Sequence, residues 1–285
     1  MINHINVKGE DEETTILDAM QTGRVIEMEN CNNNTISDLT ITGGLAEGNS
    51  PDDKGGGMYL NVSNPILNHV TISNNTAEVN GGGMYLYYSN PTLNNVTIAN
   101  NTADEGSGID EGGGMYLYSS NPTLTNSIIW DNSPESIYIY NNPNYSVSQP
   151  VINHSDIEGG WEGEGNIDAD PLFTDPENGD YTLQEGSPCI DAGIADLNGD
   201  GYDDITDFIG SAPDMGAYEF GESSEVMAGD TNFDGVVDIL DIVRIINQIM
   251  GNSEFNEDEF TAADFNADGI VDILDIVQIV NYILP

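Results

Sequence analysis

Two twelve-residue segments near the C-terminus carry oxygen-bearing side chains at matching intervals. Residues 230–241 read Asp-Thr-Asn-Phe-Asp-Gly-Val-Val-Asp-Ile-Leu-Asp, and residues 264–275 read Asp-Phe-Asn-Ala-Asp-Gly-Ile-Val-Asp-Ile-Leu-Asp. Both place such side chains at positions 1, 3, 5, 9 and 12 and glycine at position 6, which is the spacing of an EF-hand calcium loop. A hard cation takes several oxygen ligands, and the glycine allows the turn that folds them inward. The sequence therefore predicts one calcium ion in each segment.

The expected ligands are the side chains at these five positions and the backbone carbonyl at position 7. In the first loop they are Asp230, Asn232, Asp234, Val236, Asp238 and Asp241. In the second loop they are Asp264, Asn266, Asp268, Ile270, Asp272 and Asp275. A third segment with this spacing has the candidate ligands Asp196, Asn198, Asp200, Asp204 and Asp207. No apolar helix follows this third segment, so a solvated acidic turn is the alternative to a third calcium site.

Each of the first two loops is followed by an apolar stretch with helical spacing, at 242–246 and 276–280. A duplicated calcium loop with a single following helix resembles the type I dockerin domain, over residues 229–285. The resemblance implies a small all-α calcium-binding module that attaches its protein to a cohesin domain of a scaffold protein. A calcium-stabilised module without a partner is the alternative.

The resemblance also implies which residues face the cohesin, namely loop positions 10 and 11 and helix positions 17 and 18. In this chain they are Ile239, Leu240, Ile246, Asn247, Ile273, Leu274, Val280 and Asn281. The hydroxyl residues common at the first two positions in the family are absent here. An apolar recognition patch and packing within the module are therefore alternative roles for these residues.

Repeats dominate the first half of the chain. The string Gly-Gly-Gly-Met-Tyr-Leu occurs at 55–60, 81–86 and 112–117. Each copy is followed by Ser-Asn-Pro and an alternating apolar run, a pattern that predicts short strands and tight turns. One such unit cannot bury its apolar side alone, whereas stacked copies can. The sequence therefore predicts a parallel β-helix over residues 1–175, with Met58, Met84 and Met115 stacked inside, and it is similar to the right-handed parallel β-helix repeat family.

Three blocks follow the repeats, at 168–173, 186–193 and 214–219, and resemble the choice-of-anchor Q segment of secreted bacterial β-helix proteins. The resemblance implies that residues 176–221 cap the open last coil, whose unpaired edge would otherwise recruit other strands. Residues 222–228 are expected to form a linker to the module at 229–285. The predicted architecture is mainly β, with a small all-α domain at the C-terminus.

Tyrosines recur beside the buried methionines of the repeats. Because side chains alternate across a strand, these tyrosines should point outward if the Met and Leu residues point inward. The tyrosines on that face are Tyr59, Tyr85, Tyr87, Tyr116 and Tyr118. They are candidates for a platform that binds a sugar chain. The favoured alternative is a ladder that only stabilises neighbouring coils.

No catalytic residues are identifiable from the sequence. The acidic pairs at 52–53, 104–105 and 110–111 could supply the two carboxyl groups of a glycoside hydrolase, but solvated surface turns explain them more simply. Lys54 lies beside the first pair, Asp52 and Asp53, and these three residues form the one grouping typical of a polysaccharide lyase. The three histidines, His4, His69 and His154, show no catalytic or metal-binding spacing. Whether the β-helix is a hydrolase, a lyase or no enzyme stays open at this point.

The 285 residues include 50 acidic and 4 basic ones, which gives a net charge of −46. This charge argues against binding nucleic acid or anionic membrane surfaces, because phosphates are bound by Lys and Arg. No apolar stretch approaches the roughly 20 residues of a membrane span, and no signal peptide is visible at the N-terminus. Cys31 and Cys189 are expected to be buried free thiols.

Together, these features and resemblances predict an extracellular protein, secreted or attached to a cell surface. The calcium-dependent dockerin would tether it to a cohesin-bearing, cellulosome-like scaffold, and the β-helix would engage polysaccharide. The alternative is a non-catalytic adhesion or structural β-helix with a calcium-stabilised C-terminal module.

Overall fold

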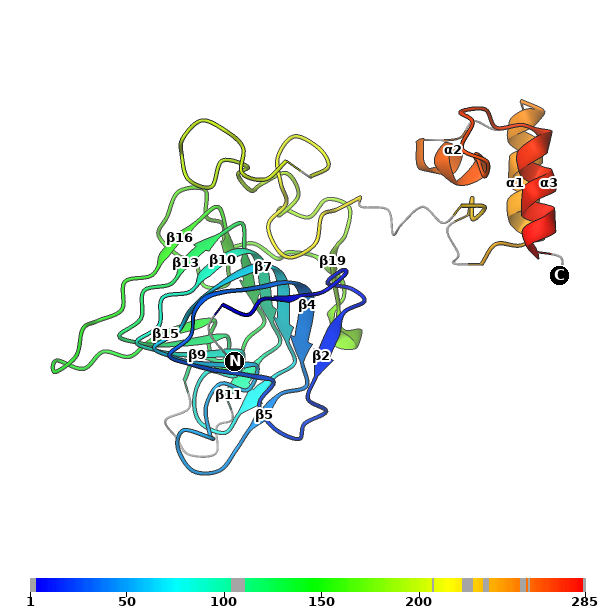
Figure 1. Ribbon diagram of the computed structural model, residues 1–285. Coiled ribbons are helices and arrows are strands. Elements are labelled where there is room, and N and C mark those ends of the chain that lie inside the picture. The colour runs from blue at the N-terminus through cyan, green and yellow to red at the C-terminus, as the bar shows by residue number, and fades with distance from the viewer. Residues whose placement is uncertain are drawn as a thin grey trace. The chain divides into compact units, whose positions relative to one another are not determined.

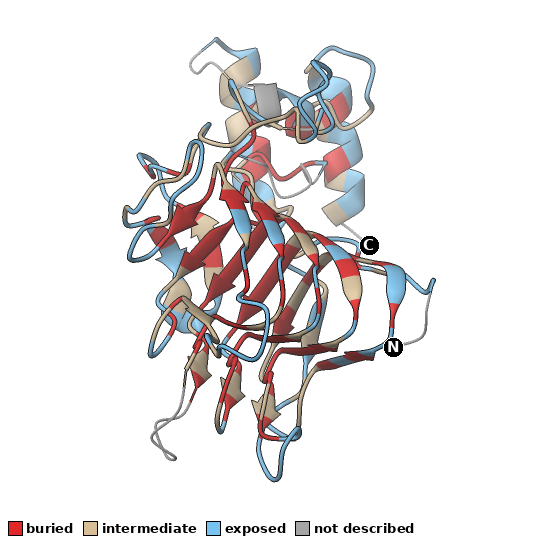
Figure 2. Cartoon of the chain, turned by 90° about the vertical axis from the view of Figure 1, so that its left-hand side faces the viewer, coloured by how far each residue is buried: buried red, intermediate tan, exposed pale blue. Residues whose placement is uncertain are grey.

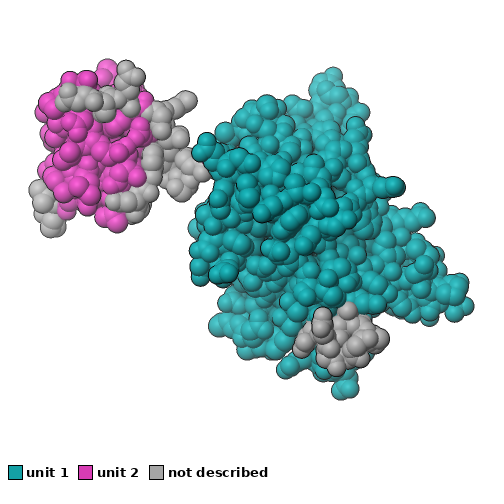
Figure 3. Space-filling model, turned by 180° about the vertical axis from the view of Figure 1, so that it is seen from behind, with its two compact units in different colours: residues 1–220 teal, residues 221–285 magenta. Residues whose placement is uncertain are grey.

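The computed structural model in Figure 1 describes residues 4–103, 111–206, 208–221, 228–232, 236–251, 255 and 257–283. The chain divides into two compact units, Met1–Phe220 and Gly221–Pro285, which Figure 3 shows in different colours. We call them the solenoid unit and the helical unit. All described strands belong to the solenoid unit, and all described α-helices belong to the helical unit.

Three sheets of stacked parallel strands build the solenoid unit. In order of pairing, the first sheet contains β1 (Val7–Lys8), β4 (Asn32–Thr42), β7 (Asn64–Ser73), β10 (Thr92–Ala99), β13 (Thr123–Thr125) and β16 (Val151–Asn153). In the same sheet, β2 (Ile16–Asp18) pairs with β4, and β14 (Ile128–Trp130) pairs with β10 and with β17 (Asp156–Ile157). The second sheet contains β3 (Ile26–Glu29), β6 (Met58–Asn61), β9 (Met84–Tyr87), β12 (Met115–Tyr118) and β15 (Ile137–Ile139). The third contains β5 (Leu45–Ala46), β8 (Thr76–Ala77) and β11 (Thr102–Ala103).

The register aligns the same repeat position in successive coils. Met58 pairs with Met84, and Met84 pairs with Met115. All three side chains are fully buried, as the repeat pattern predicts. Figure 2 shows buried residues running along the stacked strands. The predicted parallel β-solenoid is therefore confirmed.

The backbone geometry requires glycine in the triplet before each of these methionines. Gly81 has a φ of 72°, in the left-handed region that favours glycine. A Cβ atom on Gly82 would lie 2.4 Å from the carbonyl oxygen of Thr102 in the next coil. The triplet thus provides both a turn and a close approach between neighbouring coils.

Buried polar ladders join the coils at two corners. At one corner the Ser63 amide donates to the Ser89 hydroxyl, and the Ser89 amide donates to the Ser120 hydroxyl, each at 3.0 Å. At another, the Asn75 amide donates to the Asn101 side-chain oxygen at 3.1 Å. The repeated Ser-Asn-Pro and Asn-Asn-Thr-Ala strings supply these ladder residues. Buried backbone groups at the turns are satisfied in this way.

The segment after the coils, residues 173–220, is called here the flanking segment. It contains β18 (Phe173–Asp175), η1 (Pro176–Asn178) and β19 (Asp180–Leu183). Along the outer face of the first sheet, the Thr71 hydroxyl donates to the Tyr218 hydroxyl at 3.1 Å, and the Ala217 amide donates to the Thr97 hydroxyl at 3.0 Å. These contacts lie along one side of earlier coils, while the Cys189 thiol reaches Asp156 in β17 at 3.3 Å. That residues 176–221 cap the last coil stays a prediction. Near the end of the stack, Trp161 packs against the core.

The helical unit contains α1 (Ile239–Ile249), α2 (Glu257–Ala263) and α3 (Ile273–Ile283). Its core is formed by Ile242, Ile245, Ala263 and Ile279. Within the described residues, every helix is too short or too polar to cross a membrane. In the solenoid unit, Cys31 and Cys189 are buried and not joined in a disulfide, as predicted.

Candidate functional site

The second predicted calcium loop, 264–275, is folded around its first residue. The two carboxylate oxygens of Asp264 accept hydrogen bonds from the amides of Asp268 (3.0 Å) and Gly269 (2.7 Å). The side-chain oxygen of Asn266 also accepts from the Asp268 amide, at 2.8 Å. Gly269 has a φ of 83°, as expected for the glycine at position 6. The local chain therefore directs positions 1 and 3 toward the inside of the loop.

The end of this loop doubles as the start of α3. Asp272 accepts a hydrogen bond from the Leu274 amide at 2.7 Å, and Asp275 accepts from the Asp272 amide at 2.8 Å. The other oxygen of Asp275 accepts from the Asn266 amide at 3.2 Å, and its side chain is fully buried. Positions 9 and 12 thus cap the helix and tie it to the beginning of the loop.

The first loop, 230–241, repeats this arrangement at α1. Asp238 accepts from the Leu240 amide at 2.6 Å, and Asp241 accepts from the Asp238 amide at 2.8 Å, which forms a capping box. Asp241 also accepts from the Asn232 amide at 3.2 Å, and Asp230 is buried. Asp234 lies outside the described residues.

The donor set of both loops suits a hard cation, because it consists of carboxylate, amide and carbonyl oxygens without nitrogen or sulfur. A carboxylate has about four lone-pair sites, so the hydrogen bonds above leave capacity for an ion. Among the described residues, no three His, Cys, Asp or Glu side chains lie close enough together to enclose a metal ion.

The third candidate loop begins with the same hydrogen-bond pattern as the loop at 264–275. Asp196 accepts from the amides at its positions 5 and 6, Asp200 (3.2 Å) and Gly201 (2.8 Å). The Gly201 amide, as the strongest of several contributions, holds the pKa of Asp196 below its ordinary value. Asp204, by contrast, accepts from the Leu197 amide at 3.0 Å. Asp207 lies outside the described residues, so only the first part of this loop resembles the others.

The residues expected to face a partner differ in exposure. Ile239, Leu240, Ile273 and Leu274 are 63%, 55%, 67% and 55% exposed. Ile246 and Asn281 are also exposed, whereas Asn247 and Val280 are half-buried. Val280 lines a shallow apolar hollow of about 250 Å³ together with Ile239, Ile242 and Ile283. The four residues at loop positions 10 and 11 are thus not packed inside the helical unit.

On the solenoid unit, the predicted tyrosine face is a stack of rings. The ring centroids of Tyr59 and Tyr85 lie 5.5 Å apart, and those of Tyr85 and Tyr116 lie 5.1 Å apart, with interplanar angles of 1° and 13°. These three side chains are only 5–6% exposed. They therefore lack the exposed ring faces that a sugar platform requires, and the geometry fits the ladder alternative.

Four tyrosines that the repeat pattern did not single out, Tyr88, Tyr138, Tyr140 and Tyr145, extend the aromatic surface beyond this stack. Tyr87 and Tyr118 are half-buried and lie 4.9 Å apart. Tyr88 and Tyr145 are 40% and 45% exposed, and their rings contact that of Tyr118 at 5.7 Å and 5.1 Å. Both come from turns outside the strand repeat, which is why strand periodicity did not reveal them.

The cations near the tyrosine stack are engaged in structural contacts. The Arg24 guanidinium lies 4.6 Å from the Tyr59 ring centroid and donates to the carbonyl oxygen of Lys54. The Lys54 ammonium pairs with Asp53 at 2.7 Å and is 15% exposed. Lys54 is thus committed to Asp53, which does not favour a lyase role. Of the other acidic pairs, Asp104, Glu105 and Asp110 lie outside the described residues.

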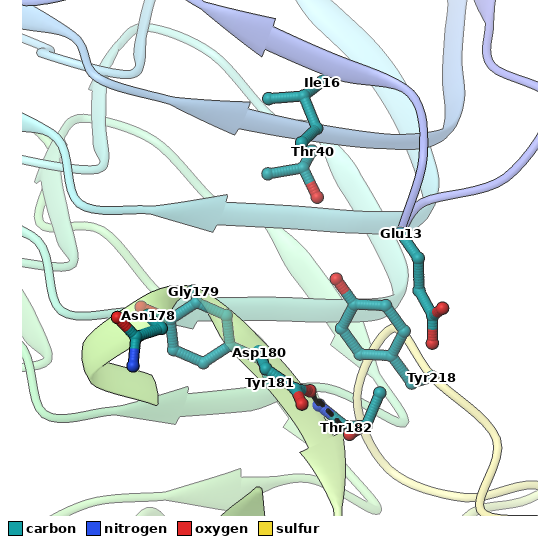
Figure 4. Close-up of a pocket in the computed structure, with 9 residues that line it drawn as sticks. All are labelled: Glu13, Ile16, Thr40, Asn178, Gly179, Asp180, Tyr181, Thr182 and Tyr218. Carbon is teal, nitrogen blue, oxygen red and sulfur yellow. Dashed lines mark hydrogen bonds between the residues drawn. The ribbon is translucent and has the colours of Figure 1, made fainter. Parts of the chain in front are cut away.

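A hollow of about 420 Å³ lies where β2, β4 and the flanking segment meet (Figure 4). Glu13 and Asp180 both line it, beside Tyr181 and Tyr218. Partial burial, followed by the charges of Asp11 and Asp180, raises the pKa of Glu13. Asp180 accepts a hydrogen bond from the Thr182 amide at 3.0 Å. The hollow therefore brings together two carboxyl groups in unequal environments, which the acidic sequence pairs did not indicate.

The structure also gives one histidine an acidic partner. The Nδ1 atom of His69 lies 3.8 Å from Asp38, and the Lys8 ammonium lies 3.2 Å from the other oxygen of the same carboxylate. These residues are too far apart in the sequence to form a spacing motif. Aligning the repeats would have shown that Asp38 and His69 follow equivalent positions, because Ser37 pairs with Asn68.

Comparison with known families agrees with both units. Residues 228–284 match the dockerin type I domain, and residues 4–168, more than half of the chain, match the right-handed β-helix region. No curated protein and no solved structure matches the chain. The resemblance of 168–219 to an anchor segment stays a prediction. Type I dockerin domains bind calcium, and the oxygen donors of the two loops fit that ion. The chain belongs to the right-handed β-helix family and carries a C-terminal type I dockerin domain.

Proposed function

We propose that this is an extracellular protein which its dockerin attaches to a cohesin-bearing scaffold, as in a cellulosome, while the solenoid unit engages polysaccharide. The observation that carries the proposal is the match of residues 228–284 to the dockerin type I domain. The duplicated exposed apolar pairs, Ile239 with Leu240 and Ile273 with Leu274, support it. Large apolar side chains exposed together on a small unit are typical of a protein-binding surface.

The cohesin would contact the beginnings of α1 and α3. The Asp238–Asp241 capping box fixes the start of α1, and Asp272 with Asp275 does the same for α3. The apolar pair directly after each N-cap is therefore held rigidly, and its position depends on the calcium loop that precedes it. Calcium binding would in this way prepare the partner-binding surface.

Binding of the full chain to an array of type I cohesins tests the tethering function. We expect binding in calcium and its loss in chelator. The double variant Leu240→Gln with Leu274→Gln should bind at least tenfold more weakly, because it removes buried apolar area at the contact. The matched control is Met250→Gln, since Met250 is 61% exposed but lies outside the predicted contact. Equal weakening by control and double variant would contradict the proposed surface.

The dockerin is proposed to hold two calcium ions, on the residues at positions 1, 3, 5, 7, 9 and 12 of each loop. The shared hydrogen-bond pattern supports a third ion at 196–207. Calorimetric titration of the full chain should then give three ions. Asp268→Ala and Asp200→Ala should each remove one, because position 5 supplies a ligand in each loop. If the chain binds two calcium ions and Asp200→Ala binds two as well, the third site is refuted.

For the solenoid unit, a binding or spacing role is a second candidate beside catalysis. The engagement of Lys54 by Asp53 and the closed stack of Tyr59, Tyr85 and Tyr116 favour it. The hollow at Glu13 and Asp180 is the place where a hydrolase would be sought first, since glycoside hydrolysis uses two carboxyl groups. Release of reducing sugar from soluble polysaccharides, compared between the wild type and Glu13→Gln, distinguishes the two roles.

A further inference from the structure

A second hollow, of about 490 Å³, lies on the solenoid unit between the first sheet and the loop at 197–206. Lys8, Asp38, Asn68, His69 and Asn94 line its sheet side. They come from four successive strands, β1, β4, β7 and β10, or from the bends inside them. The hollow therefore extends along the axis of the solenoid, across several coils.

Asp38 and His69 occupy equivalent bends in neighbouring coils. The register pairs Ser37 with Asn68 and Asn68 with Asn94, so the residues that follow them form one column. The members of this column are Asp38, His69, Asn95, Asn126 and His154, with φ values of 57°, 48°, 50°, 51° and 47°. Asparagine tolerates this left-handed conformation better than most residues other than glycine.

The asparagines of the column have a structural task. The Asn95 side chain donates to the carbonyl oxygen of Asp214 at 3.1 Å, and the Asn126 side chain donates to that of Ile194 at 2.9 Å. Both bonds fasten the flanking segment to the first sheet. Asp38 and His69 continue the column beyond these contacts and, together with Asn95, line the hollow.

Cations are scarce in this chain, which has four Lys and Arg residues and three His. Arg24 pairs with Glu27, Lys54 with Asp53 and Arg244 with Glu259. The fourth of these Lys and Arg residues, Lys8, lies near one oxygen of the Asp38 carboxylate, and His69 lies near the other.

The exposure of this group argues against a purely structural role. The side chains of Lys8, His69 and Asp38 are 74%, 36% and 22% exposed. Ion pairs this open contribute little to stability. Lys8 and His69 are therefore accessible to a ligand in the hollow, and their contacts with Asp38 add little to the stability of the fold.

The hollow offers a mixture of donors and acceptors that matches hydroxyl groups. Lys8 only donates, Asp38 accepts, and the amides of Asn68 and Asn94 do both. The net charge of −46 repels polyanions such as uronic-acid chains, and the carboxylate of Asp38 in the hollow adds to that effect. A ligand rich in hydroxyl groups and without negative charge fits these constraints best.

We propose that this hollow binds a neutral saccharide, whose hydroxyl groups bond to Asp38 and His69 and, along the solenoid axis, to Asn68 and Asn94. The inference rests on the proposed contact of the solenoid unit with polysaccharide and assigns the site for it. Lys8 orients the Asp38 carboxylate through their ion pair at 3.2 Å. The tyrosine stack has no part in this site.

The column itself supplies conservative variants for the test. Asp38→Asn and His69→Asn each introduce the residue that already occupies the same bend at positions 95 and 126, so the backbone conformation is retained. His154→Asn is the matched control, because His154 has the same bend conformation but does not line the hollow. Urea unfolding followed by tryptophan fluorescence verifies that all three variants are folded.

Affinity electrophoresis of the full chain in calcium, with β-glucan, xyloglucan, galactomannan and polygalacturonate as probes, measures the binding. We expect retention by at least one neutral polysaccharide, with Kd raised about tenfold or more by Asp38→Asn and by His69→Asn and unchanged by His154→Asn. Retention equal in all variants would overturn the site and leave the polysaccharide function standing. Retention by polygalacturonate alone would overturn the neutral class. No retention by any probe would refute the site and the polysaccharide function together, while cohesin binding is decided separately.

Discussion

Asn101 lies in the middle of the buried asparagine ladder, and its replacement by alanine should destabilise the solenoid unit by about 2–6 kcal/mol. Its side-chain oxygen accepts from the Asn75 amide at 3.1 Å, and its side-chain nitrogen donates to the carbonyl oxygen of Ile72 at 2.8 Å. In the alanine variant, the Asn75 amide and the Ile72 carbonyl oxygen stay buried but lose these hydrogen bonds. Each such group costs about 1–3 kcal/mol, which gives the range above.

Urea unfolding of the full chain, followed by tryptophan fluorescence, measures this loss. The chain has two tryptophans, Trp130 and Trp161, and both belong to the solenoid unit, so the signal reports on that unit alone. The matched control is Asn90→Ala. The Asn121 amide donates to Asn90 at 2.7 Å in a similar coil-to-coil bond, but this bond is exposed.

In the control variant, water can replace the lost hydrogen bond, so we expect a loss below about 1 kcal/mol. The two hydrogen bonds are otherwise similar, so burial should account for the difference between the two losses of unfolding free energy. Equal losses for Asn101→Ala and Asn90→Ala would refute this role of burial.

Three further outcomes are expected. Burial raises the pKa of Asp156 to about 6 from its ordinary value of 3.8, so the free energy of unfolding should fall as pH rises from about 4 to about 6. Asp156→Asn should flatten that fall in urea titrations, and an unchanged pH profile would contradict the assignment. Tyr85→Ala should cost about 3–5 kcal/mol because it breaks the ring stack, whereas Tyr85→Phe should cost less than about 1 kcal/mol; similar losses would argue against stacking. Asp180→Asn should lower the pKa of Glu13 in an NMR titration, since the Asp180 charge helps to raise it. An unchanged pKa of Glu13 would contradict an interaction between the two carboxyl groups.

Features that depend on local spacing were predictable from the sequence. All ligands of a calcium loop lie within twelve residues, and the alternation of Met58 and Tyr59 indicated which side chain points inward. Both predictions use a period that the strand or loop imposes directly. The burial of Met58 agrees with this reading.

Features that depend on contacts between distant segments were not predictable. Tyr59 is covered by Arg24, which reaches its ring from the preceding coil, and by the Tyr85 ring on the other side. The meeting of Lys8, Asp38 and His69 requires the exact register of three strands. The flanking segment has few strand pairs, so no periodic pattern indicated that it lies along the first sheet.

Chelation of the full chain tests whether the C-terminal unit is a calcium-dependent dockerin. The described α-helices all lie in the helical unit, so helical circular dichroism reports on that unit, while tryptophan fluorescence reports on the solenoid unit. In a unit this small, much of the folding free energy should come from the bound ions. We expect chelator to abolish the helical signal and excess calcium to restore it, with tryptophan fluorescence unchanged throughout. A helical signal that persists unaltered in chelator would contradict the calcium loops and, with them, the calcium-dependent attachment.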